Sequence, residues 1–330
     1  MLVKALVTAA ATASLVTAQE LMRFGCAQLT VDRVDPLVEP GNMPSAHMHQ
    51  IIGGNSFNAS MEPSNVDPPT DSTCTSCTYS EDFSNYWTAS VYFKARNGTF
   101  KRVPQYTNLG LGTKAGMTIY YIRGYQQSAK VTAFPKGFRM LVGDSTNRAA
   151  NKVPKAESLR WGALHGLRHS WLPEAALRRR LAGDGDLPLV LGRQEHGLPD
   201  HKSHIAYPNG AFEMGSACPS THPVKIPQVM YEIIFDTRQF NNKAEWPADG
   251  SQPFYWSFGD NTGYGIHGDY LFGWKDNALQ KAMDGHCAND RCAPLKRQTE
   301  AQANACLKSQ SFKESIGDDQ WLKELPGMAM

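Results

Sequence analysis

The sequence predicts an all-β protein, a β-sandwich of the jelly-roll kind with long loops and a short, disulfide-stapled helical C-terminal tail. Tyrosine, phenylalanine and tryptophan recur in short runs that turn residues separate, and the chain holds 28 glycines and 20 prolines. The apolar run 229–235 is typical of a buried central strand. This pattern of short apolar and aromatic runs between turn residues favours a sandwich over a helical bundle.

The strands are predicted from alternating or continuous apolar runs. Residues 87–94 alternate and lead into Asn97-Gly98, a strong hairpin signal, so residues 100–103 are expected as the return strand. The folded part is expected to begin near Arg23, and residues 56–82 read as a loop rich in Ser, Thr, Pro and Asp. Further strands are expected at 117–122, 137–143, 225–235 and 253–258.

The helical signal comes late in the chain. Asp276 is a cap residue ahead of Leu279, Ala282 and Met283, which fall on one face of a short helix that ends near residue 284. The sequence after Cys287 is polar and helix-prone. We therefore expect a short helix at 276–284 and a helix-prone tail after it.

The chain is predicted to start with a secretory signal at residues 1–18. An apolar run of small residues follows Lys4 and ends in Val16-Thr-Ala18, a small-x-small cleavage site. No later segment reaches the roughly 18 apolar residues of a transmembrane helix. We expect a secreted protein, extracellular or attached to a cell wall, with one β-rich domain over 19–290 and a polar helical tail over 291–330.

The net charge limits the class of partner, and two sequons fit a secreted protein. A formal charge of +2 argues against nucleic acid as a partner, because phosphate binding needs a concentrated basic patch. Asn58-Ala-Ser60 and Asn97-Gly-Thr99 are sequons, so Asn58 and Asn97 are predicted glycan acceptors.

Seven cysteines make an odd count, which needs an explanation in a secreted protein. Disulfides are the default in that compartment. Cys74 and Cys77 lack the strand–helix context of a redox motif, so a local staple or two separate bridges is expected there. Cys292 and Cys306 are expected to staple the tail. The predicted disulfide cysteines are Cys26, Cys74, Cys77, Cys218, Cys287, Cys292 and Cys306.

Histidines mark the candidate site. His47 and His49 stand at i and i+2, so on a strand both rings point to one face. Gly53 and Gly54 follow, where a strand turns or lets another group approach its backbone. Similar polar motifs recur at 200–204, 220–223 and 263–269, and we interpret them as parts of one site. The candidate catalytic residues are His47, His49, His201, His204, Asp260, His267 and Asp269.

The motifs also carry a resemblance. Pro44-Ser-Ala-His-Met-His-Gln-Ile-Ile-Gly-Gly54, Pro199-Asp-His-Lys-Ser-His-Ile-Ala-Tyr-Pro208, Cys218-Pro-Ser-Thr-His-Pro-Val224 and Gly259-Asp-Asn-Thr-Gly-Tyr-Gly-Ile-His-Gly-Asp-Tyr270 resemble a family of secreted, mostly fungal proteins known only as a domain of unknown function. The resemblance covers most of residues 23–290. It implies a protein of the fungal surface or secretome and carries over no established reaction.

Residues 153–197 depart from this pattern. They contain no Cys, Tyr or Phe and are dominated by Leu, Arg, Ala and Gly, as in a divergent insertion with a basic helix. Synonymous codons for residues 187–197, read one base later, give Phe-Pro-Ser-Cys-Trp-Asp-Gly-Lys-Asn-Thr. The resemblance implies Phe-Pro-x-Cys-Trp-Asp-Gly-Lys-Asn directly before Pro199. We therefore predict an out-of-frame segment or a misplaced intron boundary, and a visible cysteine, such as Cys218, without its partner.

The first functional hypothesis is an enzyme acting on cell-wall polysaccharide. Histidine suits proton transfer near neutral pH, so the candidate histidines and aspartates would supply acid and base groups. A lyase using His and Tyr fits as well as a hydrolase with paired carboxylates. Trp87, Trp256 and Tyr264 are the expected sugar-stacking residues, with Tyr92, Tyr255 and Trp274 beside them, unless these aromatics belong to the core.

Two further hypotheses stay open. His47, His49 and His267, with His204 or Asp269, would bind a divalent metal such as zinc, copper or manganese. Alternatively, the chain is a non-enzymatic wall or glycan-binding protein whose histidine network serves only the fold. We favour a carbohydrate-linked extracellular role, with a divalent metal as the cofactor to test.

Overall fold

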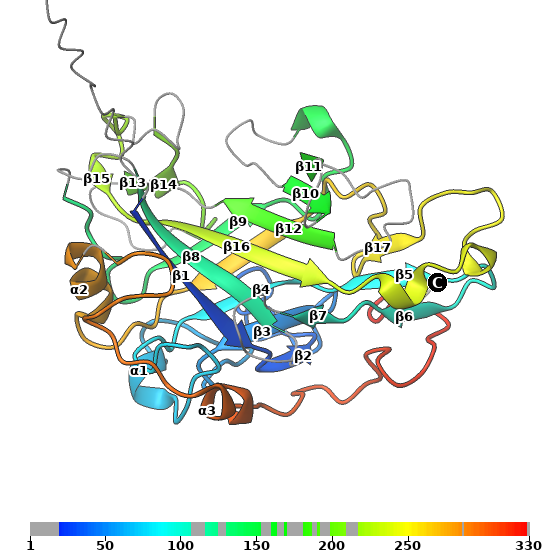
Figure 1. Cartoon of the computed structure of the whole chain (residues 1–330), viewed down its shortest axis with the longest axis horizontal. Helices are drawn as coiled ribbons and strands as arrows, with labels where there is room; N and C mark the ends of the chain where they lie inside the picture. The colour runs from blue at the N-terminus through cyan, green and yellow to red at the C-terminus, as the bar shows by residue number, and fades with distance from the viewer. Residues whose placement is uncertain are drawn as a thin grey trace, which may run out of the picture.

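Two antiparallel sheets face each other across a core rich in aromatic side chains (Figure 1). The computed structural model describes residues 20–106, 116–124, 130–152, 160–163, 168–169, 181–186, 190–191, 199–208, 217–285 and 287–328. Every strand pairing within these residues is antiparallel, which confirms the predicted β-sandwich class.

The first sheet has its centre at the strand that the sequence marked as buried. Its order is β1-β8-β16-β12-β10-β11, and β7 also pairs with β16. Val229, Ile233 and Phe235 of β16 are almost fully buried, as the continuous apolar run predicts. The strands are β1 (Glu20–Ala27), β7 (Gln105–Tyr106), β8 (Gly116–Gly124), β10 (Arg160–Ala163), β11 (Arg168–His169), β12 (Leu181–Asp186) and β16 (Gln228–Phe235).

The second sheet carries His49 at the start of β3 and His267 at the start of β18. Its order is β2-β3-β4-β18-β9. Gly53 of β3 has φ +106°, and a Cβ there would lie 1.7 Å from the Ser84 carbonyl oxygen, so the expected close backbone approach is present. The strands are β2 (Thr30–Asp32), β3 (His49–Gly53), β4 (Asn85–Ala89), β9 (Arg139–Gly143) and β18 (His267–Leu271).

Smaller elements extend the two sheets. Two three-stranded sheets have the orders β17-β5-β6 and β14-β13-β15. Their strands are β5 (Val91–Lys94), β6 (Phe100–Arg102), β17 (Phe254–Trp256), β13 (Val190–Leu191), β14 (Ile205–Ala206) and β15 (Val224–Lys225). The α-helices are α1 (Pro68–Asp71), α2 (Ala278–Asp284) and α3 (Glu300–Ala305), and short 3₁₀ helices are η1 (Ala150–Lys152), η3 (Arg238–Phe240) and η4 (Lys243–Glu245).

Residues 87–94 do not form the single strand predicted from their alternation. The strand breaks at Ser90, and β4 and β5 join different sheets. The Ser90 N–H donates to the Met48 carbonyl at 3.0 Å, and its own carbonyl accepts from Ser257 at 2.8 Å. Both partners are distant in sequence, so local alternation could not reveal the break. The predicted hairpin of β5 with β6 is confirmed.

A buried polar network joins the two sheets. The Tyr121 hydroxyl lies 2.8 Å from the Tyr86 hydroxyl and 2.9 Å from that of Tyr270, and it accepts from Trp274 Nε1 at 2.9 Å. Tyr86 in turn donates to Asp82 Oδ2 at 2.8 Å. Hydrogen bonding of every hydroxyl removes most of the desolvation cost of burying polar groups between sheets.

The opposite face of the β2-β3-β4-β18-β9 sheet is covered by loops. Ile51 and Trp87 from this sheet pack with Val34, Leu37 and Phe57 from the covering segments. This second apolar cluster closes one part of the face. The histidine motifs lie beside it, under the segment that includes Val34.

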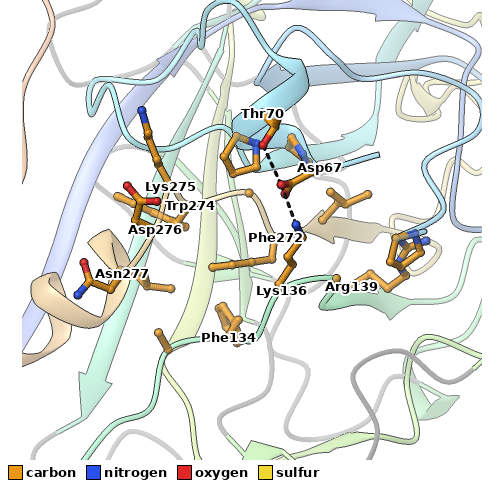
Figure 2. A pocket seen from close by; sticks show the side chains of 18 of the residues that line it. Asp67, Thr70, Phe134, Lys136, Arg139, Phe272, Trp274, Lys275, Asp276 and Asn277 are labelled. Carbon is orange, nitrogen blue, oxygen red and sulfur yellow. Dashed lines mark hydrogen bonds and ion pairs between the residues drawn. The ribbon is translucent and has the colours of Figure 1, made fainter. Parts of the chain in front are cut away.

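A cavity of about 420 Å³ opens where the loop around α1 meets the start of α2 (Figure 2). Trp274 and Phe134 line it, and Lys136 spans toward Asp67, with Nζ 2.8 Å from Asp67 Oδ2. Figure 2 shows Arg139 beyond Lys136, on the side away from Trp274.

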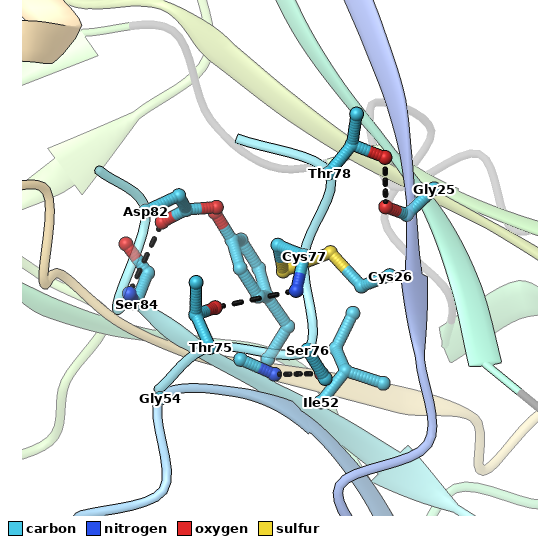
Figure 3. The surroundings of a disulfide bond; sticks show 12 residues. Gly25, Cys26, Ile52, Gly54, Thr75, Ser76, Cys77, Thr78, Asp82 and Ser84 are labelled. Carbon is cyan, nitrogen blue, oxygen red and sulfur yellow. Dashed lines mark hydrogen bonds between the residues drawn. A yellow bond between two sulfur atoms is a disulfide. The ribbon is translucent and has the colours of Figure 1, made fainter. Parts of the chain in front are cut away.

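Three disulfides tie the loops and tail to the sandwich. Cys26–Cys77 fastens β1 to the segment around Ser76, where Thr78 Oγ1 also donates to the Gly25 carbonyl at 2.7 Å (Figure 3). Cys74 and Cys77 thus belong to two separate bridges, one of the two expected alternatives. The bridges are Cys26–Cys77, Cys74–Cys306 and Cys287–Cys292, with Cys218 free.

The expected stapling of the tail through Cys292 and Cys306 is confirmed. Cys306, the C-cap of α3, pairs with Cys74, and Cys292 closes a tight loop with Cys287. Beyond α3 the tail runs along the sandwich edge, where Arg102 forms a bidentate pair with Asp318 at 2.6 and 2.7 Å.

Some predictions fall outside the described residues. The signal segment 1–18 does, and so does most of 153–197, of which only the backbone of β10 to β13 is described. The out-of-frame hypothesis therefore stays a prediction. None of the helices in the described part combines the length and the apolarity that crossing a bilayer requires.

Candidate metal centre

His47 and His49 enter the site from the start of β3. His49 is the first residue of the strand and pairs with Ala89 of β4. His47 precedes the strand by two residues, and the ring centroids lie 4.3 Å apart, so the i, i+2 prediction is confirmed. Because Ala89 has only a methyl group, β4 leaves room above it for a ring from the next strand.

That ring belongs to His267, the first residue of β18. Gly143 of β9 is its register partner. Gly143 has φ +89°, and a Cβ there would lie 2.2 Å from the Ile266 carbonyl oxygen and 3.0 Å from His267 Cβ. Only glycine fits this position, so the close approach of β9 fixes where the His267 ring sits.

The three imidazoles converge. His47 Nε2 lies 3.1 Å from His267 Nε2, and one ring nitrogen from each of the three histidines falls within 4.8 Å of the others. Nitrogens that each lie about 2.0–2.1 Å from one metal ion are roughly 2.9–3.4 Å apart, depending on the bond angle. The His47–His267 spacing falls in that range. We call His47, His49 and His267 the histidine cluster.

Hydrogen bonding fixes the state of one ring. His267 Nδ1 lies 3.2 Å from the Gly265 carbonyl oxygen, which can only accept. A neutral His267 therefore carries its proton on Nδ1 and presents the Nε2 lone pair to His47. Metal-binding histidines typically use one nitrogen for a carbonyl or carboxylate and the other for the metal. His267 has that arrangement.

His49 and Asp35 complete the inner polar set. No side chain within the described residues hydrogen-bonds the His49 ring, which lies against the Val34 backbone, and its Nε2 is 3.8 Å from Asp35 Oδ2. The Leu37 and Val38 N–H groups donate to Asp35 Oδ1, each at 3.0 Å. This turn holds the Asp35 carboxylate beside the cluster.

Burial governs the electrostatics of the cluster. His47, His49 and His267 are 8%, 0% and 4% exposed. Burial lowers the pKa of each ring, and the neighbouring histidines lower those of His47 and His49 further. All three are therefore neutral at pH 7, the form that binds metal.

Burial shifts the pKa of two carboxyl groups near the cluster upward, the opposite direction to the histidines. Burial raises the pKa of Asp35, against the backbone N–H bonds from Val38 and Leu37 and the charge of His267. Burial, followed by the charge of Asp35, raises the pKa of Asp269 well above its usual value. Neither Asp269 oxygen has a hydrogen-bond partner within the described part of the chain. A nearby cation would offset the cost of these buried carboxylates.

Three of the expected site residues lie elsewhere. His204 Nε2 bonds the Arg139 carbonyl at 2.8 Å, at the opposite end of β9 from Gly143. His201 is part of the same loop and lines a separate cavity. Asp260 accepts from Thr262 and Gly265 and so organises the loop that leads to His267. The structure brings together only His47, His49 and His267, with Asp35 and Asp269.

Some of the expected sugar-stacking residues are buried, and others are partly accessible. Trp87 and Trp256 are fully buried, so a sugar could not stack on either indole without opening the core. Trp274 and Tyr92 are core residues as well. Tyr264 is half-buried and leaves part of its side chain accessible. The predicted glycan acceptors Asn58 and Asn97 are both exposed.

A protein-family model described as Domain of unknown function (DUF1996) matches residues 35–274. The chain belongs to this family. The DUF1996 match begins at Asp35 and includes the whole histidine cluster and Asp269. No curated protein and no solved structure matches the chain. The expected resemblance to a domain-of-unknown-function family is thus confirmed.

Sequence reasoning missed two groups of this DUF1996 site. Asp35 stands in a segment without strand or helix periodicity, so no pattern linked it to His49. Lys202 lies in the polar motif 200–204 but was not a candidate residue, and its Nζ donates at 2.6 Å to the carbonyl of Gly143, the register partner of His267. Its position after Asp200 in a polar motif was the available signal.

Proposed function

We propose that this DUF1996 protein is a secreted metalloprotein whose histidine cluster binds one divalent transition metal. His47 Nε2 and His267 Nε2 would be ligands, and one nitrogen of His49 would be the third. Three imidazoles suit zinc and copper, and a nearby carboxylate extends the set toward manganese. The arrangement of His267 carries the proposal, since its Nδ1 is committed to the Gly265 carbonyl while its Nε2 faces His47 at 3.1 Å.

The surroundings support a bound cation. Asp35 Oδ2 is 3.8 Å from His49 Nε2 and would orient that ring or neutralise part of the metal charge. Phe258 packs edge-on against His47, with ring centroids 5.2 Å apart, and limits water access from that side. A metal there would act as a Lewis acid in a largely dry pocket.

Secretion is part of the same proposal. The signal-like start, the exposed sequons and the three disulfides support an oxidising, extracellular location. Disulfides are uncommon in reducing compartments, so the three pairings support export.

A second candidate is that the cluster acts on a polysaccharide. The loop that holds Asp35 also carries Leu37 and Val38, which line a cavity of about 780 Å³. Cavities of this size hold sugar-sized ligands. A hydrolase or lyase would need part of a substrate bound in this cavity to reach the histidine cluster, because proton transfer requires direct contact with the reacting atoms. The buried Trp87 and Trp256 contribute no stacking surface to it.

Metal content tests the first candidate. The protein would be expressed through a eukaryotic secretory route, dialysed extensively, and assayed for zinc, copper and manganese by mass spectrometry. We expect about one equivalent of one metal in the wild type and a large loss in His47→Asn and His267→Asn. His222→Gln is the matched control, because His222 contacts Ser203 and Thr221 outside the cluster.

Two results would reject the metal. One is a wild-type protein without metal that also fails to take up zinc, copper or manganese on titration. The other is equal metal content in His267→Asn and the wild type. Circular dichroism of each variant would confirm that the fold is retained.

A further inference from the structure

The residues that follow Asp35 line a cavity of about 780 Å³. Leu37, Val38 and Pro40 form one wall, and Pro199 and His201 form another. These aliphatic and proline side chains give the cavity an apolar lining, while its polar groups come from Glu62, Lys136, Arg139 and His201.

Arg139 is the buried cation of this cavity. Its side chain is 4% exposed, and its Nη2 donates to the Met61 carbonyl at 2.7 Å. Its Nε is buried and has no hydrogen-bond partner within the described residues. The nearest carboxylate, on Glu62, is 4.0 Å from Nη1 and 56% exposed, so it does not satisfy the guanidinium. A buried guanidinium with unused donors is costly unless an anion pairs with it.

Apart from the exposed Glu62, the neighbouring groups do not offset the positive charge of Arg139. Lys136 lies between this cavity and the smaller one, and its Nζ is bound to Asp67. His201 presents a buried Nδ1 without a partner in the described part. Burial and then the charge of Arg139 lower the pKa of His201, so this ring is neutral and acts as a hydrogen-bonding group.

We propose that this cavity binds the carboxylate of an organic acid of uronic acid size, with Arg139 as the carboxylate ligand. Arginine N–H groups form a planar fork that matches a carboxylate with two parallel hydrogen bonds. Leu37, Val38 and the prolines would cover the apolar face of a sugar ring, which favours an organic acid over phosphate. The inference stands whether or not the histidine cluster binds a metal.

Equilibrium binding tests the proposal on the full-length secreted protein. Trigalacturonate is the acidic probe, maltotriose is the neutral probe of similar size, and inorganic phosphate is the simple anion. We expect trigalacturonate to bind, with maltotriose and phosphate at least about tenfold weaker. Arg139→Gln should weaken trigalacturonate binding about tenfold or more, since it removes a charge-assisted pair.

Arg139→Gln also removes the bond to Met61, so a second variant guards against a folding defect. Val38 is 53% exposed at the cavity wall, and Val38→Trp would fill the space without disturbing the core. We expect Val38→Trp to abolish trigalacturonate binding and Val38→Ala to retain it. Both should keep the wild-type melting temperature.

Three outcomes would overturn the proposal. They are no binding of trigalacturonate by the wild type, equal binding by folded Val38→Trp, and phosphate binding as tight as that of trigalacturonate. Metal content in Arg139→Gln is expected to equal that of the wild type, which separates this site from the histidine cluster.

Discussion

His47 Nε2 and His267 Nε2 lie 3.1 Å apart, although 220 positions separate the two residues in the sequence. Two imidazoles at this distance either share a proton or direct both lone pairs at one cation. His267 uses its own proton for the Gly265 carbonyl, and no other side chain of the described residues hydrogen-bonds the His49 ring. A cation gives all three rings a role, whereas a shared proton serves only two of them.

Asp82 gives the core a predictable pH dependence. Burial raises the pKa of Asp82 to about 7, against hydrogen bonds from Ser84 and Tyr86. Between about pH 4 and pH 7 the folded protein keeps this proton while the unfolded chain loses it, so the free energy of unfolding falls as pH rises. Above about pH 7 both states are ionised, and the loss is complete.

Asp82→Asn isolates that effect. We expect the stability of the variant relative to wild type to increase from pH 4.5 to pH 7.5, by at most on the order of 4 kcal/mol. Urea unfolding at intervals of one pH unit measures it. Glu324→Gln, at an exposed position, is the control and should show a constant difference. A constant difference for Asp82→Asn would contradict the raised pKa.

We expect the stabilisation that each disulfide contributes to increase with the length of the loop that it closes. Cys74–Cys306 joins residues 232 positions apart, while Cys287–Cys292 closes a separation of five. In the chain-entropy account, the longer loop constrains the unfolded state more. We expect paired serine substitution of Cys74 and Cys306 to cost about 2–5 kcal/mol, and that of Cys287 and Cys292 clearly less. Denaturant unfolding compares them, and the reverse ranking would refute the account.

The unpaired Cys218 is relevant to the out-of-frame hypothesis for residues 153–197. It is the one unpaired cysteine of the seven. If residues 153–197 are out of frame, the corrected text restores a cysteine as a candidate partner for Cys218. We expect the sequence of the transcript across codons 145–205 to encode Cys-Trp-Asp-Gly-Lys-Asn before Asp200. A transcript that encodes residues 153–197 as written would reject this prediction.

The fold class was predictable because its signals are local. The run that became β16 is continuous and apolar, and Asn97-Gly98 marks the β5–β6 hairpin on its own. The break at Ser90 was not predictable, since it depends on bonds to Met48 and Ser257 that folding brings in from distant segments. The same reason explains why the disulfide partners of Cys292 and Cys306 could not be predicted from the sequence.

The candidate site was half predictable for a related reason. The i, i+2 spacing placed His47 and His49 together, and a similar motif supplied His267. His201 and His204 stand in a similar polar motif but lie at the other end of β9, because strand register decides which end of a strand faces the cluster. Asp35 could be found only from the structure. Its turn with Leu37 and Val38 is local, and nothing in that turn indicates that its Oδ2 lies 3.8 Å from His49 Nε2.

X-ray absorption at the edge of the bound metal tests the central claim most directly. We predict three imidazole nitrogens at about 2.0–2.1 Å in the wild-type protein and a lower imidazole count or no metal in His267→Asn. His222→Gln should give the wild-type spectrum. A metal surrounded only by oxygen ligands, or an imidazole signal that His267→Asn leaves unchanged, would contradict the assignment of the histidine cluster as a metal site.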